Sequence, residues 1–347
     1  MSQSGGGLFG RPIDPATAGS VQGIPKQTSK PASQGAAPAA EQGAVAAFDP
    51  REPTAKLEDV VLSTAVQAEV HTMLSRMQHH RVLYEEWDLK SIDRGGQKLV
   101  VNLYGPPGTG KTMLAEALAN RLSRKIIDVS YAEIESKYVG DTPKNIVAAF
   151  KAARESDSVI FFDEADSILG KRLTSVTQAS DHGVNVSRAV MLKELDRFSG
   201  IVLFATNLAR NFDGAFVRRI LFHLHVPAPD REGRLRLWRK LIPKAMPGSV
   251  ELDYEKLADA TDGMVGGDIK NAVVQAAAVA VQRESSERRV RNEDLLEASD
   301  RVKRAKLEVG DSGEARSRGS LAILSRPATT IEQVETLPHD MQAPATT

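Results

Sequence analysis

The chain has 347 residues, and its 45 Lys and Arg balance its 45 Asp and Glu, so the formal net charge is zero. A balanced charge gives no general basic footprint of the kind that nucleic-acid-binding proteins carry. Because the chain has no cysteine, disulfides, thiolate catalysis and cysteine metal sites are excluded. No segment reaches the roughly 18 apolar residues of a membrane helix, and the N-terminus lacks signal-peptide features. We therefore expect a cytoplasmic protein without membrane contact.

Two tails are predicted from composition. Residues 1–54 are rich in Gly, Pro, Ala, Ser and Gln, and they offer too little apolar surface to offset the entropy of ordering. Residues 308–347 have a similar make-up. We expect both tails to be disordered, with docking of a partner as the rival interpretation.

Between the tails, short apolar segments alternate with helical patterns. Strands are expected at residues 98–104, 126–129, 158–162, 201–205 and 223–226, and helices at 112–121, 144–153 and 189–198. Such alternation is typical of an α/β domain, in which helices cover both faces of a parallel sheet. The prediction is a three-layer αβα domain over residues 55–229.

Only helix patterns follow the Pro227-Ala228-Pro229 segment. They are expected at residues 231–241, 253–260, 267–284 and 292–303, with Asp230, Asp253 and Asn292 as N-caps. A small all-helical domain over residues 230–307 is therefore predicted.

The segment GPPGTGKT, residues 105–112, fits the pattern GxxxxGK[ST] between a predicted strand and a predicted helix. In such a loop the backbone N–H groups surround phosphates, and the helix N-terminus adds positive potential. Lys111 would reach the β- and γ-phosphates of ATP, and the Thr112 hydroxyl would bind Mg²⁺. The residues expected to contact the nucleotide here are Gly105, Pro106, Pro107, Gly108, Thr109, Gly110, Lys111, Thr112 and Met113.

Polar side chains also end two further predicted strands. In VIFFDEAD, residues 159–166, we expect Asp163 to hold Mg²⁺ through water and Glu164 to act as the general base toward the attacking water. Asn207 follows the strand at 201–205 and would reach the γ-phosphate or that water. Arg218 and Arg219 come soon after it, and a guanidinium from a neighbouring subunit stabilises charge on a γ-phosphate.

Taken together, GPPGTGKT, FFDEAD, ATN and DGAFVRRI resemble the motifs of the AAA branch of the AAA+ ATPases, over about residues 55–300. The resemblance implies a P-loop NTPase fold and a homohexameric ring with ATP and Mg²⁺ bound between subunits. It also implies that Val60, in LEDVVL, lies near the adenine, and that Gly267 stands where other branches carry a sensor arginine. The family's frequent Arg-Pro-Gly-Arg is replaced by VRRI, so the choice of main finger between Arg218 and Arg219 stays open.

The loop SKYVGD, residues 136–141, offers an aromatic side chain at a predicted turn. After Lys137, the residues Tyr138, Val139 and Gly140 match the aromatic-apolar-Gly triplet that AAA relatives project into the ring channel. An aromatic face grips many side-chain types through contact area. The hypothesis is a protein remodeller or unfoldase that pulls a polypeptide through the channel of the ring.

Other functions agree with the same motifs to different degrees. A nucleic-acid motor or loader remains an alternative, as does an assembly or disassembly chaperone for one dedicated complex. A membrane-anchored zinc metalloprotease is disfavoured because no histidines form His-Glu-x-x-His, and a non-hydrolysing scaffold because Lys111, Asp163 and Glu164 are all present. The layout resembles soluble single-ring bacterial AAA proteins, some of which accompany contractile injection particles.

Overall fold

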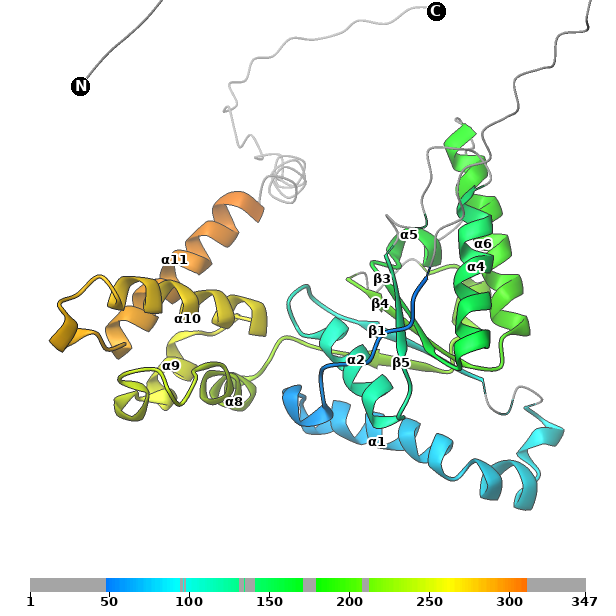
Figure 1. Cartoon of the computed structure of the whole chain (residues 1–347), viewed down its shortest axis with the longest axis horizontal. Helices are drawn as coiled ribbons and strands as arrows, with labels where there is room; N and C mark the ends of the chain where they lie inside the picture. The colour runs from blue at the N-terminus through cyan, green and yellow to red at the C-terminus, as the bar shows by residue number, and fades with distance from the viewer. Residues whose placement is uncertain are drawn as a thin grey trace, which may run out of the picture. The chain divides into compact units, whose positions relative to one another are not determined.

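The computed structural model describes residues 48–93, 96, 98–130, 134, 141–170, 179–207 and 212–310. Within these ranges an α/β domain is followed by a helical domain (Figure 1). The channel-loop prediction for Lys137, Tyr138 and Val139 falls outside the described residues, as do most residues of the two predicted tails. No helix in the described ranges is long and apolar enough to cross a membrane.

The sheet has five strands in the order β2-β3-β4-β1-β5, and every neighbouring pair is parallel. The strands are β1 (Leu99–Tyr104), β2 (Ile126–Ser130), β3 (Val159–Asp163), β4 (Ile201–Thr206) and β5 (Phe222–His225). The three inner strands consist almost wholly of buried residues, as strands covered on both faces require. All five strand predictions are confirmed, each end lying within one residue of its predicted place.

Helices cover both faces of the sheet (Figure 1). Leu99 and Leu103 of β1 pack toward one set of helices, whereas Val100 packs toward the other, because successive strand residues point to opposite faces. The first face is covered by α1 (Thr64–Gln78) and α2 (Lys111–Arg121), and the second by α4 (Asp141–Ser156), α5 (Asp166–Leu169), α6 (Ala179–Arg197) and α7 (Gly214–Val217). The predicted three-layer α/β fold is confirmed.

Two helices begin earlier than the sequence patterns indicate. Helix α4 starts at Asp141 rather than 144, because Pro143 is tolerated in a first helical turn, where no intrahelical N–H bond is lost. Helix α6 starts at Ala179 rather than 189. Its first residues are polar and include Gly183, so local propensity gives little sign of a helix there.

The chain before α1 contacts the α/β domain through residues that were predicted to belong to a tail. Arg51 and Ile126 exchange two backbone hydrogen bonds, both of 2.9 Å, in an antiparallel bridge at the β2 edge of the sheet. Phe48 packs against the core cluster of the second face. The tail prediction for residues 1–54 is therefore wrong for its last seven residues, 48–54. The local sequence pattern around Arg51 does not indicate its pairing with Ile126, which lies far along the chain.

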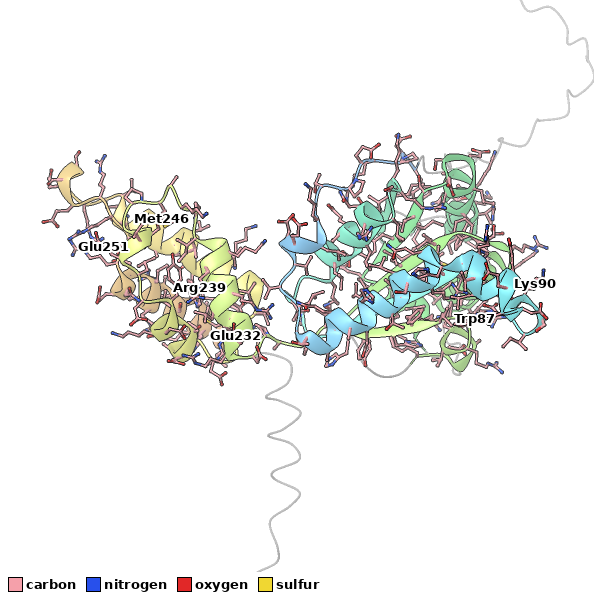
Figure 2. All side chains as sticks on the ribbon, turned by 90° about the horizontal axis from the view of Figure 1, so that it is seen from below. Trp87, Lys90, Glu232, Arg239, Met246 and Glu251 are labelled. Atoms are coloured by element: carbon pink, nitrogen blue, oxygen red, sulfur yellow. The ribbon has the colours of Figure 1, made fainter. Side chains whose placement is uncertain are left out.

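Short helical turns join the larger elements of the α/β domain. They are η1 (Leu57–Asp59), the π-helix η2 (Val82–Glu86) and η3 (Leu89–Ser91). Trp87 lies between η2 and η3 and exposes 67% of its surface, and Lys90 lies on η3; both are labelled in Figure 2.

The second domain contains α8 (Arg231–Leu241), α9 (Tyr254–Ala260), α10 (Gly266–Ala280) and α11 (Asn292–Gly310), with turns η4 (Ser249–Glu251) and η5 (Ser285–Glu287). It has its own core, in which Trp238, Leu257 and Ile269 are fully buried. Figure 2 shows Glu232 and Arg239 along α8, on the polar side of that helix. The predicted helical domain is confirmed, although α10 ends at Ala280 rather than 284 and α11 continues to Gly310.

The helix starts of this domain follow the predicted caps in two of three cases. The Asp230 carboxylate accepts from the Gly233 N–H at 2.7 Å, and Asp253 accepts from the Lys256 N–H at 3.0 Å. Asn292 does not cap its own helix. Its side chain instead exchanges hydrogen bonds with the backbone N–H and C=O of Asp253, at 2.9 and 3.1 Å, and so joins the first turns of α11 and α9.

Candidate nucleotide-binding site

The loop between β1 and α2 needs glycine at several positions. Gly108 and Gly110 have φ of +77° and +94°, in the left-handed region that glycine adopts at little cost. At Gly105 a Cβ atom would lie 2.1 Å from the backbone oxygen of Val226, the residue after β5. The predicted P-loop glycines thus fit a tightly curved backbone that lies against β5.

The N-terminus of α2 fits an anion. Its N-cap is Gly110, which has no side chain to cap the first N–H groups of this 11-residue helix. These N–H groups and the helix dipole favour negative charge at this end. The Thr109 hydroxyl donates to the Pro106 carbonyl at 3.0 Å, which stabilises the loop that leads into the helix. The backbone here can hold the phosphates of a nucleotide.

Lys111 connects the loop to the neighbouring strand β4. Its side chain is buried, and its Nζ donates to the carbonyls of Gly105 and Pro106, both at 2.9 Å, and to Oδ1 of Asn207 at 2.8 Å. Burial lowers the pKa of Lys111, while Asp163 and Asp166 act in the opposite direction. The predicted P-loop lysine and the predicted polar residue after β4 are therefore direct neighbours.

Thr112 and Asp163 meet beside this lysine. The Thr112 hydroxyl donates to Oδ2 of Asp163 at 2.9 Å, and hydroxyl and carboxylate oxygens are the ligands that Mg²⁺ prefers. Glu164 follows Asp163 with its side chain exposed, and its N–H donates to Oδ1 of Asp163 at 2.8 Å. The residues predicted to hold Mg²⁺ and to act as general base thus lie together after β3.

A cavity of about 930 Å³ opens next to these residues, a volume in the range of small-molecule sites. Its lining includes the P-loop from Pro107 to Met113, Asp163, Glu164 and Asn207, and also Val60 and Gly267. Gly105 and Pro106 are not in the lining and contribute their carbonyls to Lys111 instead. The chemistry and size of the cavity fit ATP with Mg²⁺.

Three basic residues of the cavity were not among the residues predicted to contact the nucleotide. Arg236 and Lys240 on α8 donate to the carbonyls of Leu62 and Glu58, at 2.9 and 2.6 Å. Lys270 on α10 also lines the cavity. The sequence signal for Lys270 is its place three residues after Gly267 on the same helix, because residues three apart share a helix face.

The two arginines after α7 differ in their contacts. Arg219 forms a two-pronged ion pair with Asp196 on α6, with both N–O distances 2.8 Å, and donates to the Ala215 carbonyl at 2.9 Å. Its hydrogen bonds lower the pKa of Asp196. Arg218 is exposed, and its side chain makes no hydrogen bond or ion pair with any part of the chain that the structure describes. Neither arginine lines the cavity of its own chain.

Comparison with known proteins identifies the two domains. Residues 101–228 match the model of the ATPase family associated with various cellular activities (AAA), and residues 251–297 match the AAA+ lid domain. Together the two models cover just over half of the chain.

Several curated proteins are similar over the same region. The proteasome-activating nucleotidase of Methanopyrus kandleri is 36% identical over 221 residues, which is 62% of this chain and 49% of that protein. Spastin of Anopheles gambiae is 37% identical over 55% of this chain and 24% of its own length. The cell division cycle protein 48 homolog of Archaeoglobus fulgidus is 37% identical over 53% and 25%. The chain spans half or less of each of these relatives.

The matched segments contain the loop, the two carboxylates, Asn207, Gly267 and Lys270, whereas Val60, Arg236 and Lys240 of the cavity lie outside them. A parallel α/β domain with these residues at the carboxyl ends of β1, β3 and β4 precedes a matching helical domain. The chain therefore carries an AAA-family ATPase domain over residues 101–228 and an AAA+ lid domain over residues 251–297.

Proposed function

We propose that this chain is a Mg²⁺-dependent ATPase that works as a homohexameric ring, with ATP bound between subunits, and that it remodels protein substrates. The proteasome-activating nucleotidase of Methanopyrus kandleri supports this, since its name points to action on a protein assembly and it is 36% identical to this chain over 221 residues. Single-ring bacterial AAA proteins, including those that accompany contractile injection particles, fit the same layout. Assembly or disassembly of one dedicated complex would be a special case of the same activity.

One observation carries the proposal of a shared site. Around the cavity, the chain itself supplies the lysine, the hydroxyl, the two carboxylates and the amide that a phosphoryl-transfer site uses. It places no arginine from α7 there, whereas Arg218 is exposed and without a side-chain partner among the described residues. If Arg218 enters the cavity of an adjacent copy, that cavity gains an arginine and Arg218 gains a charged partner.

Each residue of the site has a proposed role. Lys111 and the α2 N-terminus bind the phosphates, and Thr112 and Asp163 hold Mg²⁺, which would supply charge neutralisation at the phosphates. Glu164 accepts the proton of the attacking water, and Asn207 orients that water or the γ-phosphate. Val60, Met113 and Gly267 line the part of the cavity that receives the rest of the nucleotide.

Arg218 is proposed as the arginine finger, in preference to Arg219. The Arg219 guanidinium already holds Asp196 with two bonds and Ala215 with a third. A guanidinium so engaged would have to break a bidentate pair before it could serve another subunit. Arg219 instead fixes α7 against α6, and so orients the segment from which Arg218 projects.

Mixed rings test the shared site. A donor subunit with Glu164→Gln cannot hydrolyse ATP in its own site but keeps Arg218. An acceptor subunit with Arg218→Ala keeps its own site but offers no finger. Each variant alone should be nearly inactive, and mixing them should restore ATP hydrolysis, measured as phosphate release, at sites where a donor meets an acceptor. Assembled mixtures without any recovery at all ratios would refute the shared site.

The channel loop gives the second test. Tyr138→Ala should preserve basal ATP hydrolysis and abolish work on protein, whereas Tyr138→Phe should retain both, because the proposed grip depends on aromatic contact area. The substrate can be captured with Glu164→Gln rings, which should bind ATP and substrate without release. Survival of remodelling in Tyr138→Ala would remove the loop from the mechanism.

The nucleic-acid alternative receives no support from α8, the most basic helix among the described residues. Its basic side chains are engaged within the chain itself: Arg231 with Asp259 and Glu255, Arg234 with Asp262, Arg239 with Glu255, Arg236 with Leu62 and Lys240 with Asp59. A phosphate-binding surface needs cations that are free to displace counterions. We therefore place protein substrates first.

A further inference from the structure

The two residues after Glu164, Ala165 and Asp166, are hydrogen-bonded to the adjacent strand β4. The Ala165 N–H donates to the Ala205 carbonyl at 3.0 Å, and the Thr206 hydroxyl donates to Oδ1 of Asp166. Glu164 itself has φ of +52°, a left-handed conformation that costs a non-glycine residue on the order of 1 kcal/mol. These two anchors hold the strained residue in place.

The same anchors fix Glu164 relative to Asn207. Thr206 is fully buried and directly precedes Asn207, whose amide oxygen accepts from Lys111. The Asp166–Thr206 hydrogen bond therefore joins the loop of the general base to the strand end of the polar residue. A shift of either one is passed to the other.

Helix α5 starts at Asp166 and ends against the segment that leads to Arg218. The Gly170 N–H donates to the Asp166 carbonyl at 3.1 Å, and Gly170 forms an antiparallel bridge with Phe212. Beside it, the Asp213 N–H donates to the Leu169 carbonyl at 2.9 Å. One helical turn thus separates the contact with β4 from the contact with this segment.

Asp213 continues the connection into α7. It is the N-cap of α7 and accepts from the Ala215 N–H at 2.8 Å, and Arg218 is the C-cap of the same helix. Leu169 of α5 and Phe216 of α7 are fully buried in one core cluster. Because packed interiors have little free volume, short elements that share such a core move together.

We propose that α5 is a rigid link that couples the Glu164–Asn207 end of a subunit's own site to the Arg218 that the subunit offers to its neighbour. Asp166 is the positioning residue at the start of this link. The state of one site in the ring thereby sets the placement of the finger in the next. The inference rests on the proposed function, because it requires that Arg218 acts in the adjacent subunit.

Mixed rings isolate the coupling from any effect on the donor's own chemistry. The donor already carries Glu164→Gln, so its own site contributes no turnover, and the acceptor carries Arg218→Ala. Adding Asp166→Ala to the donor alone should lower the recovered ATP hydrolysis about tenfold, because the finger is misplaced in the acceptor site. The loss should lie in kcat of the mixed ring, with little change in KM, since the acceptor's own binding residues are intact.

Conservative and matched variants show whether the Asp166–Thr206 hydrogen bond accounts for the loss of ATP hydrolysis. Asp166→Asn retains an oxygen that accepts from Thr206, so a donor with this change should recover most of the activity. Thr206→Val in the donor removes the hydroxyl with nearly the same shape and leaves the charge near Lys111 untouched, so it should reproduce the loss. Glu155→Ala, which changes an exposed acid on α4, should have no effect.

The outcomes separate the inference from the proposed function. Donors with Asp166→Ala and Thr206→Val that activate the acceptor as well as the parental donor would overturn the inference. An Asp166→Asn donor as inactive as Asp166→Ala would also overturn it. If Asp166→Ala fails to enter rings, the Thr206→Val donor decides alone. A parental mixture without activity would refute the shared site, and the inference with it.

Discussion

The carboxyl edge of the sheet and the end of α7 differ in how many of their polar side chains have partners within the described part of the chain. At the carboxyl edge, Lys111 has three acceptors within the chain, and Thr112 is bonded to Asp163. At the end of α7, Arg219 is equally well satisfied, but Arg218 has no side-chain partner in the described part of the chain. In the first region the polar groups are bonded to one another, and in the second one cation has no side-chain partner among the described residues.

This difference separates two tasks of the proposed enzyme. Groups that are already oriented need no reorganisation when a phosphate binds, so the carboxyl edge is suited to binding by a single chain. A free guanidinium gains most where it meets charge that its own chain does not provide. Nucleotide binding is therefore expected of one subunit, and rapid hydrolysis only of an assembly.

The largest expected effect is on ATP hydrolysis, and it tests whether Arg218 and Arg219 have different roles. Arg218→Ala should lower ATP hydrolysis by about 10³-fold or more, the range of a lost arginine finger, while ATP binding and thermal stability stay close to the parent. Arg219→Ala should cost about 1 kcal/mol of stability through loss of its bidentate pair and should retain measurable hydrolysis. Phosphate release and denaturant unfolding measure the two quantities.

Arg218→Lys serves as the matched variant, because it keeps the charge without the planar fork and should recover only part of the activity. Equal losses of hydrolysis in Arg218→Ala and Arg219→Ala, with both proteins folded and assembled, would contradict the division of roles.

The second prediction separates ATP binding from ATP hydrolysis at the carboxyl edge of the sheet. Glu164→Gln should lower hydrolysis by about 10²- to 10⁴-fold, because the amide cannot accept the proton of water. ATP affinity should change little, since Glu164 makes no bond to Lys111 or Thr112. Equilibrium binding of a fluorescent ATP analogue and steady-state phosphate release test both statements. Near-normal turnover in this variant would show that another group is the base.

The third prediction concerns stability and the outer side of the P-loop helix. Burial acts to raise the pKa of Glu116 on α2, but hydrogen bonds from Thr54 and Arg51 outweigh it and lower the pKa from 4.5 to about 2. A depressed carboxyl pKa adds stability that is present above the unfolded-state value and lost as pH falls toward the folded-state value. Glu116→Gln should therefore cost about 1–3 kcal/mol at neutral pH.

The difference between Glu116→Gln and the parent should shrink as pH falls from about 4.5 to about 2, measured by urea unfolding at a series of pH values. Glu155→Gln, an exposed acid with a 3.8 Å pair to Lys151, is the control and should change stability by less than about 0.5 kcal/mol. A difference for Glu116→Gln that stays constant with pH would show that Glu116 is not held ionised by the residues before α1.

Much of the fold followed from sequence because its signals are local. The five strands are continuous apolar segments, and burial on both faces leaves little freedom in where such a segment begins or ends. The P-loop is similarly local, since Gly108 and Gly110 are required by their own backbone conformations. The caps at Asp230 and Asp253 involve partners three residues away.

The features that sequence did not predict depend on partners far along the chain. Arg51 pairs with Ile126 and Glu116 across more than sixty residues, and the first turns of α6 have polar residues with weak helix propensity. The roles of Arg218 and Arg219 could not be separated either, because the two residues are identical and adjacent. The tertiary contacts of Arg219 with Asp196 and the Ala215 carbonyl distinguish the pair.

The sequence by itself determined the order of strands and helices, the nucleotide loop and the acidic strand end, because each depends on residues near one another in the chain. The tertiary structure alone decided which strand ends meet, and it joined Lys111 to Asn207 across 96 positions. It also decided that Arg219 is engaged with Asp196, whereas Arg218 has no side-chain partner among the described residues. Such contacts follow from how the helices pack on the sheet, which local pattern does not encode.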